Sequence, residues 1–278
     1  MNFIIYLSGK VDTKEPNLKI GSFNIRTFGP TKISNKTIVN TICQILSKYD
    51  IVAIQEIRDS NIDYVVTILI NQLNEYVLSK GIKYSYAISP RLGFSSYKEI
   101  YAFIYRNVVD GLPRRILPVS QMVYENAETI FDRPPFIVEF KIFNTTLSID
   151  KFTLMNIHLR PSYVLEESLA LRQVVDWYYE LNSKTKRHVA ILGDFNFDCS
   201  YISAANRDKV RNVLSDFTWY IRDRYATTIS TRNCAYDRII SDSPELMRAI
   251  IAETNRTFRY DNQFGLTAEY TEKTPNEF

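Results

Sequence analysis

Five polar side chains stand at the ends of apolar runs that are typical of β-strands. Asn24 follows LKIGSF, Glu56 follows IVAIQ, His158 follows TLMNI, and Asp194 and Asn196 follow VAILG. Because a sheet holds the next residue's backbone rigidly, the end of a strand is where a preorganised site is built. Carboxylate and amide oxygens suit Mg²⁺, Mn²⁺ or Ca²⁺ rather than zinc or copper. A histidine beside such a cation suits cleavage of phosphate esters.

Each of these residues also has an ordinary structural explanation. A single Asn or Glu after a strand is most often a turn former or a helix cap. The chain has two histidines, and His188 lies in the polar run TKRH, where we expect it to be exposed and without function. The combination of carboxylates, amide and His158 at several strand ends is harder to explain as turn formation alone.

The pattern of apolar residues predicts the elements that would position these side chains. Period-2 or continuous apolar runs predict strands, and helical spacing predicts helices, one of them starting at Ser34. The predicted strands are 18–25, 51–57, 83–89, 98–106, 136–142, 152–158, 189–192, 236–240 and 247–252. The predicted helices are 34–49, 62–73, 165–181 and 203–214. This mixture predicts an α/β (α+β) sandwich of two mixed sheets flanked by helices.

Composition restricts the class of protein without identifying a partner. The chain has 278 residues, of which 45% are hydrophobic and 23% charged, as in ordinary globular proteins. No apolar run reaches the ~20 residues of a membrane span. The net charge of +3 is too small to argue for any partner. We expect a single domain over residues 18–278 and treat residues 1–17, with their short apolar stretch, as a remnant of a signal segment.

Seven motifs together resemble the deoxyribonuclease I family, in the same order and spacing. They are SFNIRTFG, IVAIQEIRDS, SPRLGFSSYKEIYAFIYR, DRPPF, NIHLRPS, ILGDFNFDCSYI and NCAYDRII. GDFN occurs across the wider phosphoesterase superfamily, whereas GDFN followed by CSY and NCAYDR is specific to the deoxyribonuclease branch. The third motif resembles the gamma-type relatives more closely than the pancreatic enzyme. The resemblance implies a four-layer α/β sandwich that hydrolyses double-stranded DNA to 5′-phosphate ends with low sequence specificity, using Mg²⁺ and Ca²⁺, with Mn²⁺ as a substitute.

The resemblance also implies a role for each residue of the site. Glu56 matches the metal-binding glutamate of the family, and Asn24 matches the asparagine beside it. His158 matches the histidine that acts on the scissile phosphate. Glu99 matches the glutamate that orients this histidine and raises its basicity. Asp194 and Asn196 match the pair that positions the phosphate, water or metal.

Other matched positions concern DNA binding and stability. Arg58, Tyr97 and Arg133 match DNA-contacting positions, where an arginine in the minor groove and a tyrosine on a sugar give little base readout. Cys199 and Cys234 match a family disulfide. Cys43 would then be a buried free thiol inside a helix.

The match fails at the C-terminal end of the family pattern. The family ends in a Ser-Asp-His-aromatic-Pro-Val strand that carries a second catalytic histidine, partner to the aspartate that is Asp237 here. This sequence runs FGLTAEYTEKTPNEF instead and has no third histidine. Three explanations stay open: a truncated gene model, an enzyme weakened by ~10²–10⁴-fold, or a non-catalytic relative that only binds.

The expected partner is double-stranded DNA, and the protein is expected to be a monomer that does not bind membranes. The alternatives are an inactive module that binds DNA or a protein such as actin, and a related phosphoesterase acting on another substrate. The family and the cysteine pair favour a secreted protein, or one of the secretory pathway or nuclear envelope.

Overall fold

The computed structural model describes residues 2–7, 18–109, 115–125, 130–143, 149–182, 188–228, 233–249 and 256–258. Within these residues the strands form two six-stranded sheets. In spatial order, the first contains β12 (Arg256–Phe258), β1 (Asn2–Leu7), β2 (Leu18–Phe28), β3 (Ile51–Ile57), β5 (Ile100–Val109) and β4 (Ile82–Ile88). The second contains β10 (Thr218–Trp219), β11 (Asp237–Ser241), β9 (Val189–Asp194), β8 (Lys151–His158), β7 (Phe136–Phe143) and β6 (Arg115–Val123).

Both sheets are mixed, and their strands pair in the same pattern. In each, the two central strands are parallel, β2 with β3 and β8 with β9, and all other pairs are antiparallel. The sequence prediction of two mixed sheets is therefore confirmed. Because β2, β3, β8 and β9 contact one another across the sandwich, the side chains at their carboxyl ends converge on one edge.

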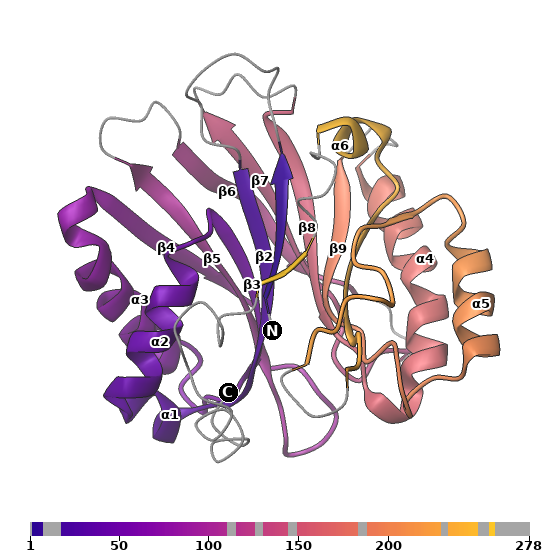
Figure 1. Cartoon of the computed structure of the whole chain (residues 1–278), viewed down its shortest axis with the longest axis horizontal. Helices are drawn as coiled ribbons and strands as arrows, with labels where there is room; N and C mark the ends of the chain where they lie inside the picture. Colours follow the sequence, from indigo (N-terminus) through magenta and orange to yellow (C-terminus); the bar gives the residue numbers. More distant parts are fainter. Residues whose placement is uncertain are drawn as a thin grey trace.

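Helices cover the outer face of each sheet (Figure 1). The first sheet is covered by α1 (Pro30–Ser34), α2 (Lys36–Leu46) and α3 (Tyr64–Val77), which continues into the 3₁₀ turn η1 (Leu78–Lys80). The second is covered by α4 (Val164–Leu181), which follows the 3₁₀ turn η2 (Pro161–Tyr163), and by α5 (Ala204–Val213). The four layers enclose three apolar clusters, one between the sheets and one under each helical layer.

A buried amide pair links the two sheets just below the convergent edge. The Gln55 side chain donates from Nε2 to Asn156 Oδ1 at 2.6 Å, and Asn156 donates from Nδ2 to the carbonyl oxygens of Ile54 and Ala102. Gln55 precedes Glu56, and Asn156 lies two residues before His158. Because a buried amide must satisfy its hydrogen bonds, this pair holds the two sheets together at the site.

Two predicted elements are corrected by the structure. Helix α2, which was predicted to start at Ser34, begins at Lys36. The Asn35 side chain caps it by accepting hydrogen bonds from the backbone N–H groups of Thr37 and Ile38. The strand predicted over 247–252 is wrong where the structure describes it: α6 (Pro244–Ala249) is a helix. Ser243 caps this helix, since its Oγ accepts a hydrogen bond from the Leu246 backbone, and Pro244 is its first residue. This arrangement favours the start of a helix more strongly than the apolar run favours a strand.

The N-terminal residues take part in the first sheet. Strand β1 pairs antiparallel with β2, with Ile5 opposite Ile20, and also with β12. Residues 2–7, which we expected to lie outside the domain, thus supply a strand beside the one that carries Asn24. Among the described helices, none is long and apolar enough to span a membrane.

Candidate active site

Strand register places three of the expected site residues side by side. His158 on β8 lies opposite Asp194 on β9, and Asp194 lies opposite Asp237 on β11. The glycine before Asp194 makes the approach of β8 and β9 possible. Gly193 has a φ of +149°, and a Cβ atom there would lie 1.9 Å from the carbonyl oxygen of Ile157. Any other residue would therefore push apart the strands that carry His158 and Asp194.

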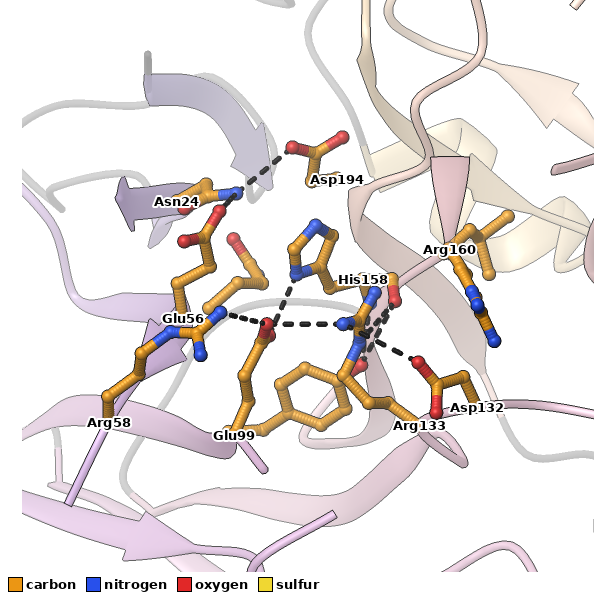
Figure 2. Close-up of polar contacts among 12 residues, drawn as sticks. Asn24, Glu56, Arg58, Glu99, Asp132, Arg133, His158, Arg160 and Asp194 are labelled. Atoms are coloured by element: carbon orange, nitrogen blue, oxygen red, sulfur yellow. Dashed lines mark hydrogen bonds and ion pairs between the residues drawn. The ribbon is translucent and has the colours of Figure 1, made fainter. Parts of the chain in front are cut away.

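Asn24 links the two sheets through its amide group. Its Nδ2 donates to Glu56 Oε1 at 2.9 Å and to Asp194 Oδ2 at 3.0 Å (Figure 2). The other Glu56 oxygen accepts from the Thr27 backbone at 2.9 Å. Glu56 and Asn196 both have positive φ angles, 63° and 50°. Non-glycine residues adopt this conformation at a cost of roughly 1–3 kcal/mol, and such strain clusters at functional sites.

Glu99 holds the imidazole of His158. Their Oε2 and Nδ1 atoms are 2.8 Å apart, and Glu99 Oε1 accepts from Arg133 Nη1 at 3.1 Å and from Arg58 Nη2 at 3.3 Å (Figure 2). Burial lowers the pKa of His158, but Glu99 raises it more, so that this pKa lies above its usual value. Burial likewise raises the pKa of Glu99, and His158 with the two arginines lowers it below the usual value.

Asp194 and Asn196 form a tight turn at the end of β9. Asp194 Oδ1 accepts from the Asn196 backbone at 2.8 Å, and the Asn196 side chain donates to the Leu159 carbonyl at 2.8 Å. The Leu159 backbone in turn donates to the Asp194 carbonyl at 2.9 Å. These bonds connect the segment after His158 to the segment after Asp194, so the two strand ends hold each other.

Asp237 lies in this row without a partner for one of its oxygens. Its side chain is buried, and Oδ1 has no hydrogen-bond partner among the described residues. Burial, together with the charge of Asp194, raises the pKa of Asp237 to about 7. The other histidine, His188, is half-buried rather than exposed; its Nδ1 lies 2.9 Å from Ser243 Oγ, and its carbonyl accepts from Thr153 at the opposite end of β8.

The three residues expected to contact DNA differ in exposure. Tyr97 is 72% exposed, and the Arg58 guanidinium lies 5.3 Å from the centre of its ring. Arg133 is only 8% exposed, and besides Glu99 its Nε contacts the His158 carbonyl at 3.1 Å. In this conformation Arg133 stabilises the Glu99–His158 pair, and DNA contact by Arg133 stays a prediction.

The predicted disulfide between Cys199 and Cys234 is present, with Cα atoms 5.9 Å apart. It joins the loop after Asn196 to the segment just before Asp237. Cys43 is buried and free, as expected, and burial raises its pKa to about 12.

Two residues at the site escaped the sequence analysis. Tyr101 accepts from the His158 backbone through its hydroxyl group at 2.8 Å. Glu167, which is 1% exposed, accepts from the backbones of Asp132 and Arg160 at 2.8 and 2.7 Å. Both contact backbone atoms of other segments, and such contacts leave no local pattern in the sequence. The one available signal was Glu167, a charged residue on the apolar face of a helix.

Glu56 and Asn24 are the residues that could hold a divalent cation. The Oδ1 atom of Asn24 is buried and without a hydrogen-bond partner among the described residues, and the Glu56 carboxylate is partly exposed beside it. The described residues contain no cluster of three or more His, Cys, Asp or Glu side chains that could hold a metal. One carboxylate with an amide oxygen beside it fits Mg²⁺, which binds to one or two carboxylates and completes its shell with water and phosphate oxygens.

Comparison with known proteins agrees with this fold. The model of the Endonuclease/Exonuclease/phosphatase family matches residues 21–251. Deoxyribonuclease-1 of Sus scrofa is 35% identical over 260 residues, covering 91% of this chain and 86% of the relative. Deoxyribonuclease-1 of Homo sapiens is 34% identical over 269 residues, covering 94% and 90%. The chain thus belongs to the Endonuclease/Exonuclease/phosphatase family and, within it, to the deoxyribonuclease I family.

Solved structures of distant relatives share the fold. A mannosyl-6-phosphatase of Bacteroides thetaiotaomicron superposes with a TM-score of 0.54 at 18% identity, covering 82% of this chain and 85% of the other. The catalytic domain of human Nocturnin superposes with a TM-score of 0.52 at 13% identity, covering 84% of each chain. At such identities the likeness concerns the architecture alone.

Proposed function

We propose that the protein is a divalent-metal-dependent endodeoxyribonuclease that hydrolyses double-stranded DNA to 5′-phosphate ends with low sequence specificity. The observation that carries the proposal is the convergence at one edge: the Glu99–His158 pair lies beside Asp194, which Asn24 joins to Glu56. The two relatives described above are both named deoxyribonucleases, which supports DNA as the substrate.

The residues of this chain divide the reaction between them. His158 has Nδ1 committed to Glu99, so Nε2 is left to accept the proton of the attacking water. Glu99 holds the ring and stabilises the imidazolium that forms. Glu56 and Asn24 would hold Mg²⁺ or Mn²⁺, which would neutralise charge on the attacked phosphate. Asp194 and Asn196 hold the two strand ends in place. The oxygen of the attacking water bonds to phosphorus and the P–O3′ bond breaks. The departing O3′ takes a proton from solvent water, and the phosphate stays on the 5′ side.

Weak sequence preference follows from the exposed contacts. Arg58 stacked on Tyr97 presents a cation and an aromatic face next to the Glu99–His158 pair. Contacts of this kind read groove shape, sugar and phosphate, and they carry little information about the bases.

Nicking of supercoiled plasmid in Mg²⁺ and Ca²⁺ tests the proposal. We expect the wild-type protein to convert supercoiled plasmid to open circles, chelator to abolish the reaction, and His158→Ala to be nearly inactive. Absence of nicking by the wild type above the His158→Ala background would remove the enzymatic claim.

A second candidate is a DNA-binding protein of the same fold without turnover. The unpartnered Oδ1 of Asp237 favours it, because this carboxyl group has no imidazole beside it in the described part of the chain. Salt-sensitive gel shifts of duplex DNA without any cleavage would support this candidate over the first.

We also propose that the protein works outside the cell or in the secretory pathway. The Cys199–Cys234 disulfide supports this location, because such bonds persist in oxidising compartments. Nothing observed favours the nuclear envelope. Recovery of the protein from the culture medium of expressing cells would test its location.

Size-exclusion chromatography of the protein alone would test whether it is a monomer, and the same measurement with monomeric actin would test the actin alternative.

A further inference from the structure

An exposed arginine follows the central histidine of the site by two residues. The Arg160 guanidinium lies 4.9 Å from the centre of the Tyr163 ring, and Tyr163 is 49% exposed. Arg160 lies within the NIHLRPS motif, but neither it nor Tyr163 is among the residues that the resemblance implies for DNA contact. Stacking of this kind restricts the arginine side chain while leaving its N–H groups open to a ligand.

The backbone that carries Arg160 is fixed relative to His158. The Arg160 backbone donates to the buried Glu167 carboxylate at 2.7 Å. The preceding residue, Leu159, is bonded to both Asp194 and Asn196. The backbone at Arg160 is therefore held by the same contacts that hold the site, and the Tyr163 ring is the contact of its guanidinium.

The charge of Arg160 has no counter-ion among the described residues. Glu167 binds the Arg160 main chain and not its side chain. Asp132, the other nearby carboxylate, has an ion pair with Arg133 at 3.9 Å. An exposed arginine without an ion pair, next to a site for phosphate chemistry, is suited to bind an anionic oxygen, and the planar guanidinium can bind phosphate through two N–H groups.

A similar pair lies on the other side of the site. Arg58 stacks on Tyr97 at 5.3 Å, as Arg160 stacks on Tyr163 at 4.9 Å. In Figure 2, Arg58 and Arg160 lie at opposite ends of the row that contains Glu99 and His158. A duplex crossing the site would meet one arginine–tyrosine pair on each side of the reacting phosphate.

We propose that Arg160, held by Tyr163, is a second phosphate-binding position, which contacts the DNA backbone on the side of His158 opposite to Arg58. The inference rests on the proposed function, since it takes DNA as the ligand. Binding of a backbone phosphate there affects affinity and orientation, whereas the chemical step stays with His158 and the metal-binding residues.

The test measures duplex binding in a background that cannot cleave. His158→Ala and the double variant His158→Ala/Arg160→Ala are titrated with a mixed-sequence 20-base-pair duplex in Mg²⁺, over salt concentrations from about 50 to 200 mM. Losing one phosphate contact is expected to reduce the slope of log affinity against log salt by about 0.9, which is about a threefold difference over this range. Arg160→Lys keeps the charge and is expected to restore the slope.

Lys80→Ala is the matched control. Lys80 lies 5.6 Å from the ring of Tyr76, before β4 and at the far end of the first sheet, so its loss should leave the slope unchanged. In the active background, Arg160→Ala should raise KM several-fold and leave kcat nearly unaltered. A purely structural role for Arg160 would instead lower the melting temperature without changing the salt slope.

The outcomes separate this inference from the proposed function. Duplex binding and plasmid nicking with an unchanged slope in Arg160→Ala would overturn the inference and leave the nuclease proposal intact. Absence of both salt-dependent duplex binding by His158→Ala and nicking by the wild type would overturn both. A reduced slope that Arg160→Lys restores would support the phosphate-binding position.

Discussion

Glu99 and Asp237 are both buried carboxyl groups. Glu99 lies next to His158 and Asp237 lies next to Asp194, and the pKa values of the two carboxyl groups shift in opposite directions. Glu99 meets an imidazole and two guanidinium groups, and its pKa falls below the usual value. Asp237 meets the carboxylate of Asp194, and its pKa rises to about 7. Burial raises the pKa of both, so the neighbours decide the direction of the net shift.

The two halves of the site differ in the sign of the charges that meet, and we call the half around Glu99 the complete half and the half around Asp237 the incomplete half. Around Glu99, every charge has a partner of opposite sign, and the imidazole is oriented by a hydrogen bond. Around Asp237, one oxygen lacks a partner among the described residues. In the described residues the first half holds a carboxylate and an oriented imidazole, the pair that acid–base chemistry uses, whereas Asp237 lies opposite the carboxylate of Asp194.

Removing the imidazole from the complete half should have the largest effect. His158→Ala is expected to lower the rate of plasmid nicking by ~10²–10⁴-fold, because it removes the proton acceptor. His188→Ala is the control and should nick at the wild-type rate, since His188 lies at the other end of β8. Equal rates for His158→Ala and the wild type would show that the Glu99 half does not perform the chemistry.

Opening the disulfide should act on the Asp237 half. Cys199→Ser is expected to lower the free energy of unfolding by about 3–4 kcal/mol, since the bond closes a loop of 35 residues. Urea denaturation of the variant and of the reduced wild type should give the same loss. If neither is less stable, the bond does not constrain the segment that carries Asp237.

Weakening the charge balance of the complete half should change the pH dependence. Glu99→Gln is expected to reduce nicking by about 10²-fold. Because Glu99 raises the pKa of His158, its loss should shift the acidic limb of the rate profile to lower pH, where His158 is then already neutral. The pH profile of kcat/KM measures this shift, and a limb that stays in place would contradict the assignment of His158 as the titrating group.

Replacing the carboxyl group of Asp237 by a neutral amide should have the smallest effect, and it should raise the free energy of unfolding. With a folded-state pKa of about 7, Asp237 holds a proton in the folded protein that the unfolded chain releases. The free energy of unfolding therefore falls as pH rises from about 4 to 7. Asp237→Asn should be more stable than the wild type by roughly 1–3 kcal/mol at pH 8 and nearly equal at pH 4. Thermal melts in chelator test this, and a variant less stable at pH 8 would mean that Asp237 is charged and paired.

The sequence alone determined the strand ends that carry the site and the family to which the chain belongs. Alternating and continuous apolar runs predicted β2, β3, β8 and β9, because side-chain periodicity is a local property of the chain. The motifs around Glu56, Asp194 and Cys234 predicted the family and the disulfide.

Only the tertiary structure decided how these elements act together. Strand pairing placed His158, Asp194 and Asp237 opposite one another, and Gly193 allowed β8 and β9 to approach closely. The packing of the chain buried Arg133 against Glu99 and left Arg160 exposed beside the site. The tertiary structure also made a helix of Pro244–Ala249, whose last three residues belong to the apolar run predicted as a strand over 247–252. Register, burial and charge arise from contacts between residues far apart in the chain, and no local pattern of residues carries that information.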